Sequence, residues 1–259
     1  MALDLSSVRE ALPGRLIHYL PTTASTMEEA ARLARNGSPS GTTVVADEQT
    51  AGRGRHGRVW HSEPESGLYV SVVLLPAMRV ESLPVLALAL GLAAAEAIKR
   101  TAGLACDLRW PNDVLIDERK VAGILVELAD GAAIAGIGIN VNHPSFPEGL
   151  RDEAASLRLA SGRVQSREAL LLALLKSVDS FSQMFFEGGP QPVIQMFSRS
   201  SSYVRGKRVC VEQDDGIVVG VTAGLDSSGF LTVDKDDGTQ AVIVAGGVRP
   251  VGGSHAFGS

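Results

Sequence analysis

Residues 49–60 read QTAGRGRHGRVW and begin shortly after an apolar run, TTVVA at 42–46, that is typical of a buried strand, with Asp47 and Glu48 between them. Glycines and arginines alternate in this stretch: Gly52, Arg53, Gly54, Arg55, Gly57 and Arg58. Glycine lets backbone amides approach a ligand closely, and each guanidinium is a permanently charged, bidentate donor for a carboxylate or a phosphate. Because the stretch holds no acidic residue, we predict an anion-binding loop at the end of a strand.

The same stretch satisfies the pattern G-x-G-x-x-G, but it does not fit a dinucleotide-binding fold or a kinase. A dinucleotide fingerprint has to open a helix, and the residues that follow, RVWHSEPESG at 58–67, contain Pro64 and turn-forming stretches. No H-R-D or D-F-G segment follows either. We therefore exclude both nucleotide-binding folds.

Around this loop, helix-period runs alternate with short apolar runs, which indicates a mixed α/β protein. The predicted helices cover residues 25–36, 82–100 and 166–186, and the predicted strands cover 42–46, 68–75, 107–110, 114–116, 121–128 and 133–141. Ser25, with Glu28 three residues later, has the spacing of a capping box, and Ser82 and Ser166 stand at the other two helix starts. Glycine and proline at 188–192 end the last helix.

After Arg205 the pattern changes to short β-rich runs separated by turns, such as RVCVEQ at 208–213 and GIVVGVTAGL at 216–225. We predict two domains, residues 1–204 and a small, barrel-like all-β domain at 205–259.

Composition excludes several classes of protein. Apolar residues make up 45% and charged residues 20% of the 259 residues, which is ordinary for a folded domain. The net charge of −5 argues against a nucleic-acid binder. Residues 83–98, the most apolar run, are too short and too interrupted to span a membrane, and the N-terminus lacks a secretion signal. Cys106 and Cys210 stand far apart, which fits a reduced, cytoplasmic setting.

Two further segments carry polar groups at strand ends. RWPND at 109–113 predicts a tight turn that exposes Asp113 at a strand edge, and Lys120 opens the next strand, with Gly123 letting a ligand lie against the backbone. GIGINVN at 136–142 ends a buried strand with two asparagines, whose side chains suit a base edge or a phosphate oxygen. Alone, each has an ordinary structural alternative: an edge-strand lysine and a β-turn.

Together these motifs resemble the biotin protein ligase family. The matching residues, in order from about Pro21 to the end of the chain, are Ser25 and Thr26, Gln49 with the loop at 52–58, Trp60, WPND at 110–113, KVAGILVE at 120–127 and GIGINVN at 136–142. Two positions depart from the family pattern: Met27 replaces the usual Asn, and Arg109 replaces the usual Lys with its charge preserved. The resemblance implies a mixed sheet flanked by helices, a class II synthetase-like core, with an SH3-like C-terminal barrel.

The resemblance also implies the reaction: biotin and ATP form biotinyl-5′-AMP, and the biotinyl group passes to a lysine of a biotin carboxyl carrier protein of acetyl-CoA carboxylase or a related carboxylase. It assigns the catalytic role to Lys120, Arg53 and Arg55. It assigns biotin to Ser25, Thr26, Gln49, Gly52, Arg53, Lys120 and Gly123, and the nucleotide to Arg55, Arg58, Trp60, Asn112, Asp113, Asn140 and Arg249. Magnesium accompanies ATP, and no metal is assigned to side chains, including His56 and His61.

Two alternatives stay open: a lipoate or octanoate ligase of the same superfamily, which would lack the arginine–glycine loop, and a biotin-responsive binding protein without ligase activity. A helix-turn-helix repressor is not expected, because the stretch before Pro21 is too short for three helices of about 11 residues. We expect a monomer or a homodimer that binds neither nucleic acid nor membrane.

Overall fold

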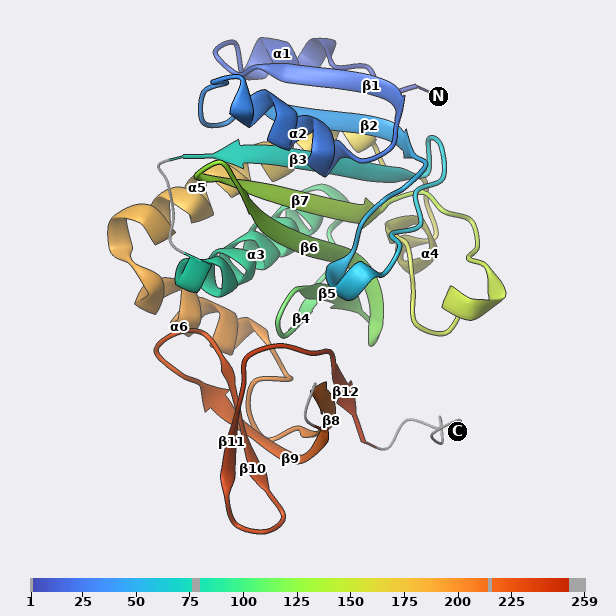
Figure 1. Cartoon of the computed structure of the whole chain (residues 1–259). Helices are drawn as coiled ribbons and strands as arrows, with labels where there is room; N and C mark the ends of the chain where they lie inside the picture. Colours follow the sequence, from blue (N-terminus) through green and yellow to red (C-terminus); the bar gives the residue numbers. More distant parts are fainter. Residues whose placement is uncertain (1, 76–79, 214–215, 252–259) are drawn as a thin grey trace.

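The computed structural model describes residues 2–75, 80–213 and 216–251, and a seven-stranded mixed sheet organises most of them (Figure 1). The strand order is β1-β2-β3-β7-β6-β5-β4. The strands are β1 (Ile17–Thr23), β2 (Thr43–Gln49), β3 (Gly67–Leu74), β4 (Asp107–Arg109), β5 (Asp113–Ile116), β6 (Arg119–Ala129) and β7 (Ala132–Asn140). Only the pairing of β1 with β2 is parallel among these. The predicted mixed α/β fold is confirmed.

Helices cover the two faces of this sheet unequally. The long apolar helices α3 (Leu83–Ala102) and α5 (Arg167–Gly188) pack on each other and, with α6 (Pro190–Ser200), cover one face, where most of the core lies (Figure 1). The other face carries α2 (Thr26–Arg35), which packs on β2, β3 and β7 and barely reaches β6. The β6 side of that face is therefore left for the arginine–glycine loop and a ligand.

Two helices, Val80–Ala102 and Arg167–Gly188, are long and apolar enough to cross a membrane by length and composition alone. In the structure their apolar residues belong to the main core, where Leu86 and Leu90 meet Leu171 and Leu174 in one cluster. Packing against the sheet therefore accounts for their composition.

All three predicted helix starts are confirmed, but only Ser166 makes a side-chain cap hydrogen bond. Ser166 Oγ accepts a hydrogen bond from the Ala169 amide, and α3 begins after Ser82 with a proline in its first turn. Ser25 occupies the N-cap position of α2, but its side chain makes no cap hydrogen bond, so the capping-box prediction is wrong. Its hydroxyl points to the functional site instead.

Among the α-helices and strands of the first sheet domain, four were not predicted: α1 (Ser6–Ala11), β1, α4 (Leu157–Ser161) and α6. β1 contains Pro21, which argues against a strand but is tolerated here because β1 is at the sheet edge. The glycine–proline segment does end α5, yet Pro190 also starts α6, since proline suits the first turn of a helix.

The C-terminal region forms a second, antiparallel sheet in the order β11-β10-β9-β8-β12. Its strands are β8 (Arg208–Gln213), β9 (Gly216–Leu225), β10 (Leu231–Lys235), β11 (Gln240–Ile243) and β12 (Val248–Pro250). The small β domain is confirmed, but within the described residues β11 and β12 do not pair to close a barrel. Trp110 Nε1 donates a hydrogen bond to the Gly229 carbonyl at 2.9 Å, which docks this sheet on the first. The predicted domain range ends in residues 252–259, outside the described part.

Candidate active site

Glycines form the floor of a pocket on the face of the sheet that α2 covers only in part. Gly123 on β6 pairs with Gly138 on β7, and Gly136 lies two residues away on the same face. A Cβ at Gly138 would lie 2.5 Å from Trp60 Cε2, and one at Gly123 would lie 2.7 Å from Trp60 Cζ3. The indole ring therefore rests directly on the backbone of two paired strands. We expected a ligand to lie against Gly123; in the structure the Trp60 ring lies there.

Trp60 and Met27 together close the floor of the pocket. A Cβ at Gly136 would lie 2.5 Å from Met27 Sδ, so the methionine side chain covers this third glycine. Met27 is buried in the small core cluster between α2 and the sheet. The asparagines of GIGINVN were given the ligand role above, but the structure shows that its glycines shape the pocket. The signal in the sequence was the alternation of glycine at 136 and 138 within a buried strand.

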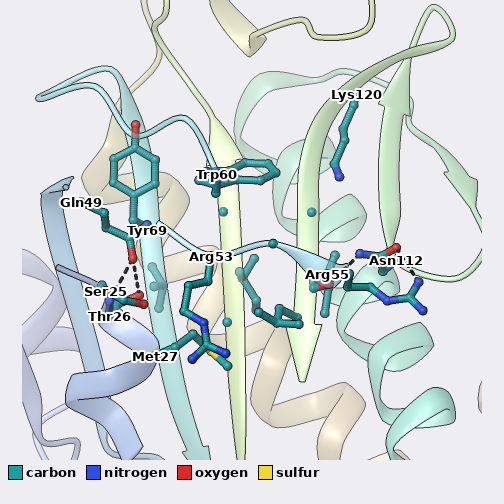
Figure 2. A pocket seen from close by; sticks show the side chains of 18 residues that line it. Ser25, Thr26, Met27, Gln49, Arg53, Arg55, Trp60, Tyr69, Asn112 and Lys120 are labelled. Atoms are coloured by element: carbon teal, nitrogen blue, oxygen red, sulfur yellow. Dashed lines mark hydrogen bonds between the residues drawn. The ribbon is translucent and has the colours of Figure 1, made fainter. Parts of the chain in front are cut away.

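One end of the pocket is polar and uncharged. Gln49 Oε1 accepts hydrogen bonds from the Thr26 amide and hydroxyl at 2.9 and 3.1 Å (Figure 2). Gln49 Nε2 donates to Ser62 Oγ at 3.0 Å. Thr26 Oγ1 lies 2.8 Å from Ser71 Oγ. Gln49 and Thr26 thus hold the start of α2. Ser25 Oγ is buried without a hydrogen-bond partner among the described residues, so it is the hydroxyl left to bond a ligand.

The arginine–glycine loop is a small hairpin over this pocket. The Trp60 amide donates to the Gly52 carbonyl at 2.9 Å, and the Gly54 amide donates to the Arg58 carbonyl at 2.7 Å. A 3-10 turn, Arg55–Gly57, closes the tip. A Cβ at Gly52 would lie 2.6 Å from the Trp60 carbonyl oxygen, so glycine is required there by close backbone approach.

The opposite end of the pocket is cationic and centres on Asp113. Lys120 Nζ lies 2.5 Å from Asp113 Oδ1, and Arg109 Nη2 lies 2.8 Å from Asp113 Oδ2. The Asp113 side chain is only 15% exposed, so the prediction that the turn exposes it is wrong. Burial by itself would raise the pKa of the Asp113 carboxyl, but the charges and hydrogen bonds of Lys120 and Arg109 outweigh it and hold the pKa below its ordinary value.

Of the loop arginines Arg53 and Arg55, only Arg55 reaches this end. Arg55 Nη1 donates to Asn112 Oδ1 at 3.3 Å, and Asn112 Nδ2 donates to the Ile124 carbonyl at 2.8 Å. Burial lowers the pKa of Arg55, and the carboxylate of Asp113 opposes that shift. Arg53 Nη2 instead pairs with Glu127 Oε1 on β6 at 2.9 Å. Lys120 Nζ lies 5.3 Å from the centre of the Trp60 ring, a cation–π distance.

A second cavity adjoins the cationic end and brings the two sheets together. It is lined, among others, by Arg55, Arg58, Trp60, Arg109, Asn112, Asp113, Lys120, Asn140 and Arg249. Arg249 comes from strand β12 of the C-terminal sheet, where a turn was expected. Every residue assigned above to the nucleotide therefore lines one cavity.

Two asparagines of these motifs, Asn140 and Asn142, make hydrogen bonds to backbone groups of the protein. Asn140 Nδ2 donates to the Ala155 carbonyl at 3.1 Å, and Asn142 exchanges two hydrogen bonds with the Gln165 backbone. Both asparagines thus fasten the loop that follows β7. Asn140 lines the cavity with its donor already engaged.

Comparisons with known proteins agree with this architecture. Residues 19–143 match the model of the Biotin/lipoate A/B protein ligase family, and residues 205–248 match the Biotin protein ligase C terminal domain. The Bifunctional ligase/repressor BirA of Bacillus spizizenii is 35% identical over 239 residues, covering 90% of this chain and 73% of the relative. The Biotin–[acetyl-CoA-carboxylase] ligase of Mycobacterium tuberculosis is 33% identical, covering 95% of this chain and 94% of the relative. The chain belongs to the biotin protein ligase family.

A solved biotin protein ligase shares the fold over nearly its whole length. The structure of the Aquifex aeolicus enzyme in complex with biotin and ATP superposes with a TM-score of 0.80 at 34% identity, covering 90% of this chain and 97% of that one. The family identification made from the motifs is confirmed. In this biotin protein ligase fold, the segments at 25–26, 49–60, 110–113 and 120–123 meet at one pocket although they lie on four different elements.

Proposed function

We propose that this protein joins biotin to ATP, forming biotinyl-5′-AMP and pyrophosphate, and then transfers the biotinyl group to a lysine of a biotin carboxyl carrier protein. One observation carries the proposal. The Ser25 hydroxyl, which has no hydrogen-bond partner among the described residues, lies at one side of the pocket and the charges of Lys120 and Arg55 at the other, with Trp60 between them (Figure 2). Biotin has the matching order of groups, a polar ureido ring, an apolar body and a terminal carboxylate.

In the first step a biotin carboxylate oxygen attacks the α-phosphorus of ATP, and the bond from that phosphorus to pyrophosphate breaks. Both reactants are anions, so their repulsion has to be neutralised while they are aligned. Lys120 lies between the pocket and the adjoining cavity and lines both, which lets one ammonium group contact the carboxylate and the α-phosphate. Arg55 approaches from the loop, whereas Arg53 has to leave Glu127 to take part. The substrate is the magnesium complex of ATP.

Lys120 has to turn from Asp113 toward the substrate anions during this step. Asp113 keeps Arg109 as a partner when this happens, so the buried carboxylate is not left without a countercharge. The arginine at 109, which departs from the usual lysine, supplies two donors to Asp113, through Nε and Nη2. Asp113 is therefore a positioning residue for Lys120 and does not contact the nucleotide in this proposal.

In the second step the amine of the acceptor lysine attacks the carbonyl carbon of the mixed anhydride, AMP leaves, and the amine loses a proton. A thiol relay is not supported, because burial raises the pKa of the Cys106 thiol to about 12 and Cys210 is buried in the C-terminal sheet. The names of relatives from Mycobacterium tuberculosis and Paracoccus denitrificans, both Biotin–[acetyl-CoA-carboxylase] ligase, support the carrier protein as acceptor. We propose a cytoplasmic location and a monomer or homodimer.

The matched family also includes lipoate ligases. The Ser25 hydroxyl is the group that would favour biotin over lipoate. An octanoyl or lipoyl chain offers nothing to hydrogen-bond a buried hydroxyl, whereas a ureido group does. Pyrophosphate release is measured with ATP and each acid in turn. We expect release with biotin and none above background with octanoate, and we expect Ser25→Ala to weaken biotin use by about 10-fold or more. Release with octanoate or lipoate but not biotin would refute the proposal.

The transfer step is tested with labelled biotin, ATP and a biotin carboxyl carrier domain, beside the same domain carrying Lys→Arg at its acceptor site. We expect label on the lysine form alone, and we expect the rate to rise from neutral to alkaline pH as the attacking amine loses its proton. Equal labelling of both forms, or of neither, would reject specific transfer.

A further inference from the structure

Two histidines and a glutamate meet at the foot of the arginine–glycine loop, a cluster that the sequence analysis did not anticipate. His61 and Glu63 follow Trp60 along the chain, and His143 comes from the loop after β7. The ligand atoms of the three side chains all lie within 4.8 Å of one another. His61 Nε2 is 3.0 Å from Glu63 Oε1, and the two imidazole rings are 5.9 Å apart between centroids.

His143 is the unusual member of this cluster. It is fully buried, with 0% of its surface exposed, yet neither ring nitrogen has a hydrogen-bond partner in the part of the chain that the structure describes. A buried polar group without a partner costs free energy, so its retention calls for an explanation. Stacking on Phe146 fixes the ring but satisfies neither nitrogen. A neutral imidazole has a lone pair on one ring nitrogen, which a metal ion can accept.

We propose that His61, Glu63 and His143 bind a divalent transition-metal ion of the Zn²⁺ class. Two imidazole nitrogens and one carboxylate oxygen form the His₂Glu donor set that zinc accepts together with a fourth, non-protein ligand. Water can supply that ligand, because the His61 and Glu63 side chains are 30% and 45% exposed. Imidazole donors disfavour magnesium and calcium, so this site is distinct from the magnesium that accompanies ATP.

The location indicates what the ion does. The Ser66 carbonyl already accepts hydrogen bonds from the Val141 and Asn142 amides, so the segments at 61–66 and 141–143 run side by side. A metal ion bound to both would cross-link the foot of the loop to the end of β7. His61 also lines the cavity that holds Lys120 and Arg249. The ion would therefore position the foot of the loop beside this cavity.

Binding of zinc to untagged, chelator-treated protein tests this proposal. Zinc is titrated by competition with a chromophoric chelator, and cobalt is the spectroscopic probe of tetrahedral ligation. We expect one equivalent of zinc per chain at micromolar free metal, a tetrahedral cobalt spectrum, and a higher unfolding temperature with zinc. His61→Ala and the isosteric Glu63→Gln should each weaken zinc binding at least about 10-fold and remove the thermal shift.

The matched control is His56→Ala, which removes another histidine of the same loop that lies outside the cluster; it should bind zinc like the wild type. Glu63→Gln keeps the shape of the side chain, so it remains informative if a histidine variant does not fold. The proposal is overturned if the wild type takes up no zinc under these conditions. It is equally overturned if His61→Ala and Glu63→Gln bind zinc with unchanged affinity.

Discussion

Gly138→Ala probes the contact on which the pocket depends, the indole ring of Trp60 lying on the sheet. The new Cβ would be 2.5 Å from Trp60 Cε2, 2.6 Å from Nε1 and 2.8 Å from Cζ2. Carbon atoms in contact sit about 3.5–4.0 Å apart, so the ring has to move outward by about 1 Å. The backbone of β7 cannot yield instead, because it is paired with β3 on one side and β6 on the other.

The consequences follow from that displacement. Overpacking costs about 1–3 kcal/mol of unfolding free energy. A shift of about 1 Å in a group beside the reacting atoms costs on the order of 100-fold in rate. We therefore expect Gly138→Ala to stay folded with a lower free energy of unfolding in urea, and to release pyrophosphate from biotin and ATP about 100 times more slowly. Gly149→Ala is the control, since a Cβ there meets nothing within 4 Å.

A second substitution shows whether the ring is the cause. Trp60→Phe shortens the side chain, so the double variant Gly138→Ala/Trp60→Phe should lose less stability than the sum of the two single changes. Additive losses would mean that the alanine acts elsewhere. Wild-type stability together with a wild-type rate for Gly138→Ala would refute the close contact itself.

Other predictions concern the cationic end and the loop. Lys120→Ala should abolish pyrophosphate release while the protein stays folded, whereas normal release would remove Lys120 from the mechanism. The same variant should lose about 1–2 kcal/mol of unfolding free energy at pH 7, because Lys120 pairs with the buried Asp113. The folded-state pKa of Asp113 is lowered, so this stabilisation is present above the unfolded pKa and is lost as the pH falls through the folded value; urea unfolding near pH 3 should show a smaller difference than at pH 7. Tryptic cleavage after Arg53, Arg55 or Arg58 should slow when biotin and ATP are bound, because the guanidiniums then gain anionic partners; equal cleavage rates would contradict a ligand-ordered loop.

Much of the site was readable from local sequence. The anion-binding role of the loop at 52–58 was predicted without knowledge of the fold, because a stretch of alternating glycines and arginines that lacks an acidic residue is typical of an anion-binding loop. The two long helices, α3 and α5, could also be predicted from local sequence. Their many apolar residues are typical of helices that pack in a core, and the structure places them there. β1 was missed because Pro21 argues against a strand until the edge position is known.

The sequence by itself determined the mixed α/β class and the cationic loop, since each depends on residue types close together in the chain. The resemblance of its motifs predicted the role of Lys120. Only the tertiary structure decided that Asp113 is largely buried between two cations, that Trp60 lies on Gly123 and Gly138, and that His143 lies beside His61. Burial and contact between residues far apart in the chain depend on strand order and register. A one-residue shift in the pairing of β6 with β7 would turn the glycines to the other face of the sheet, and no local pattern records that register.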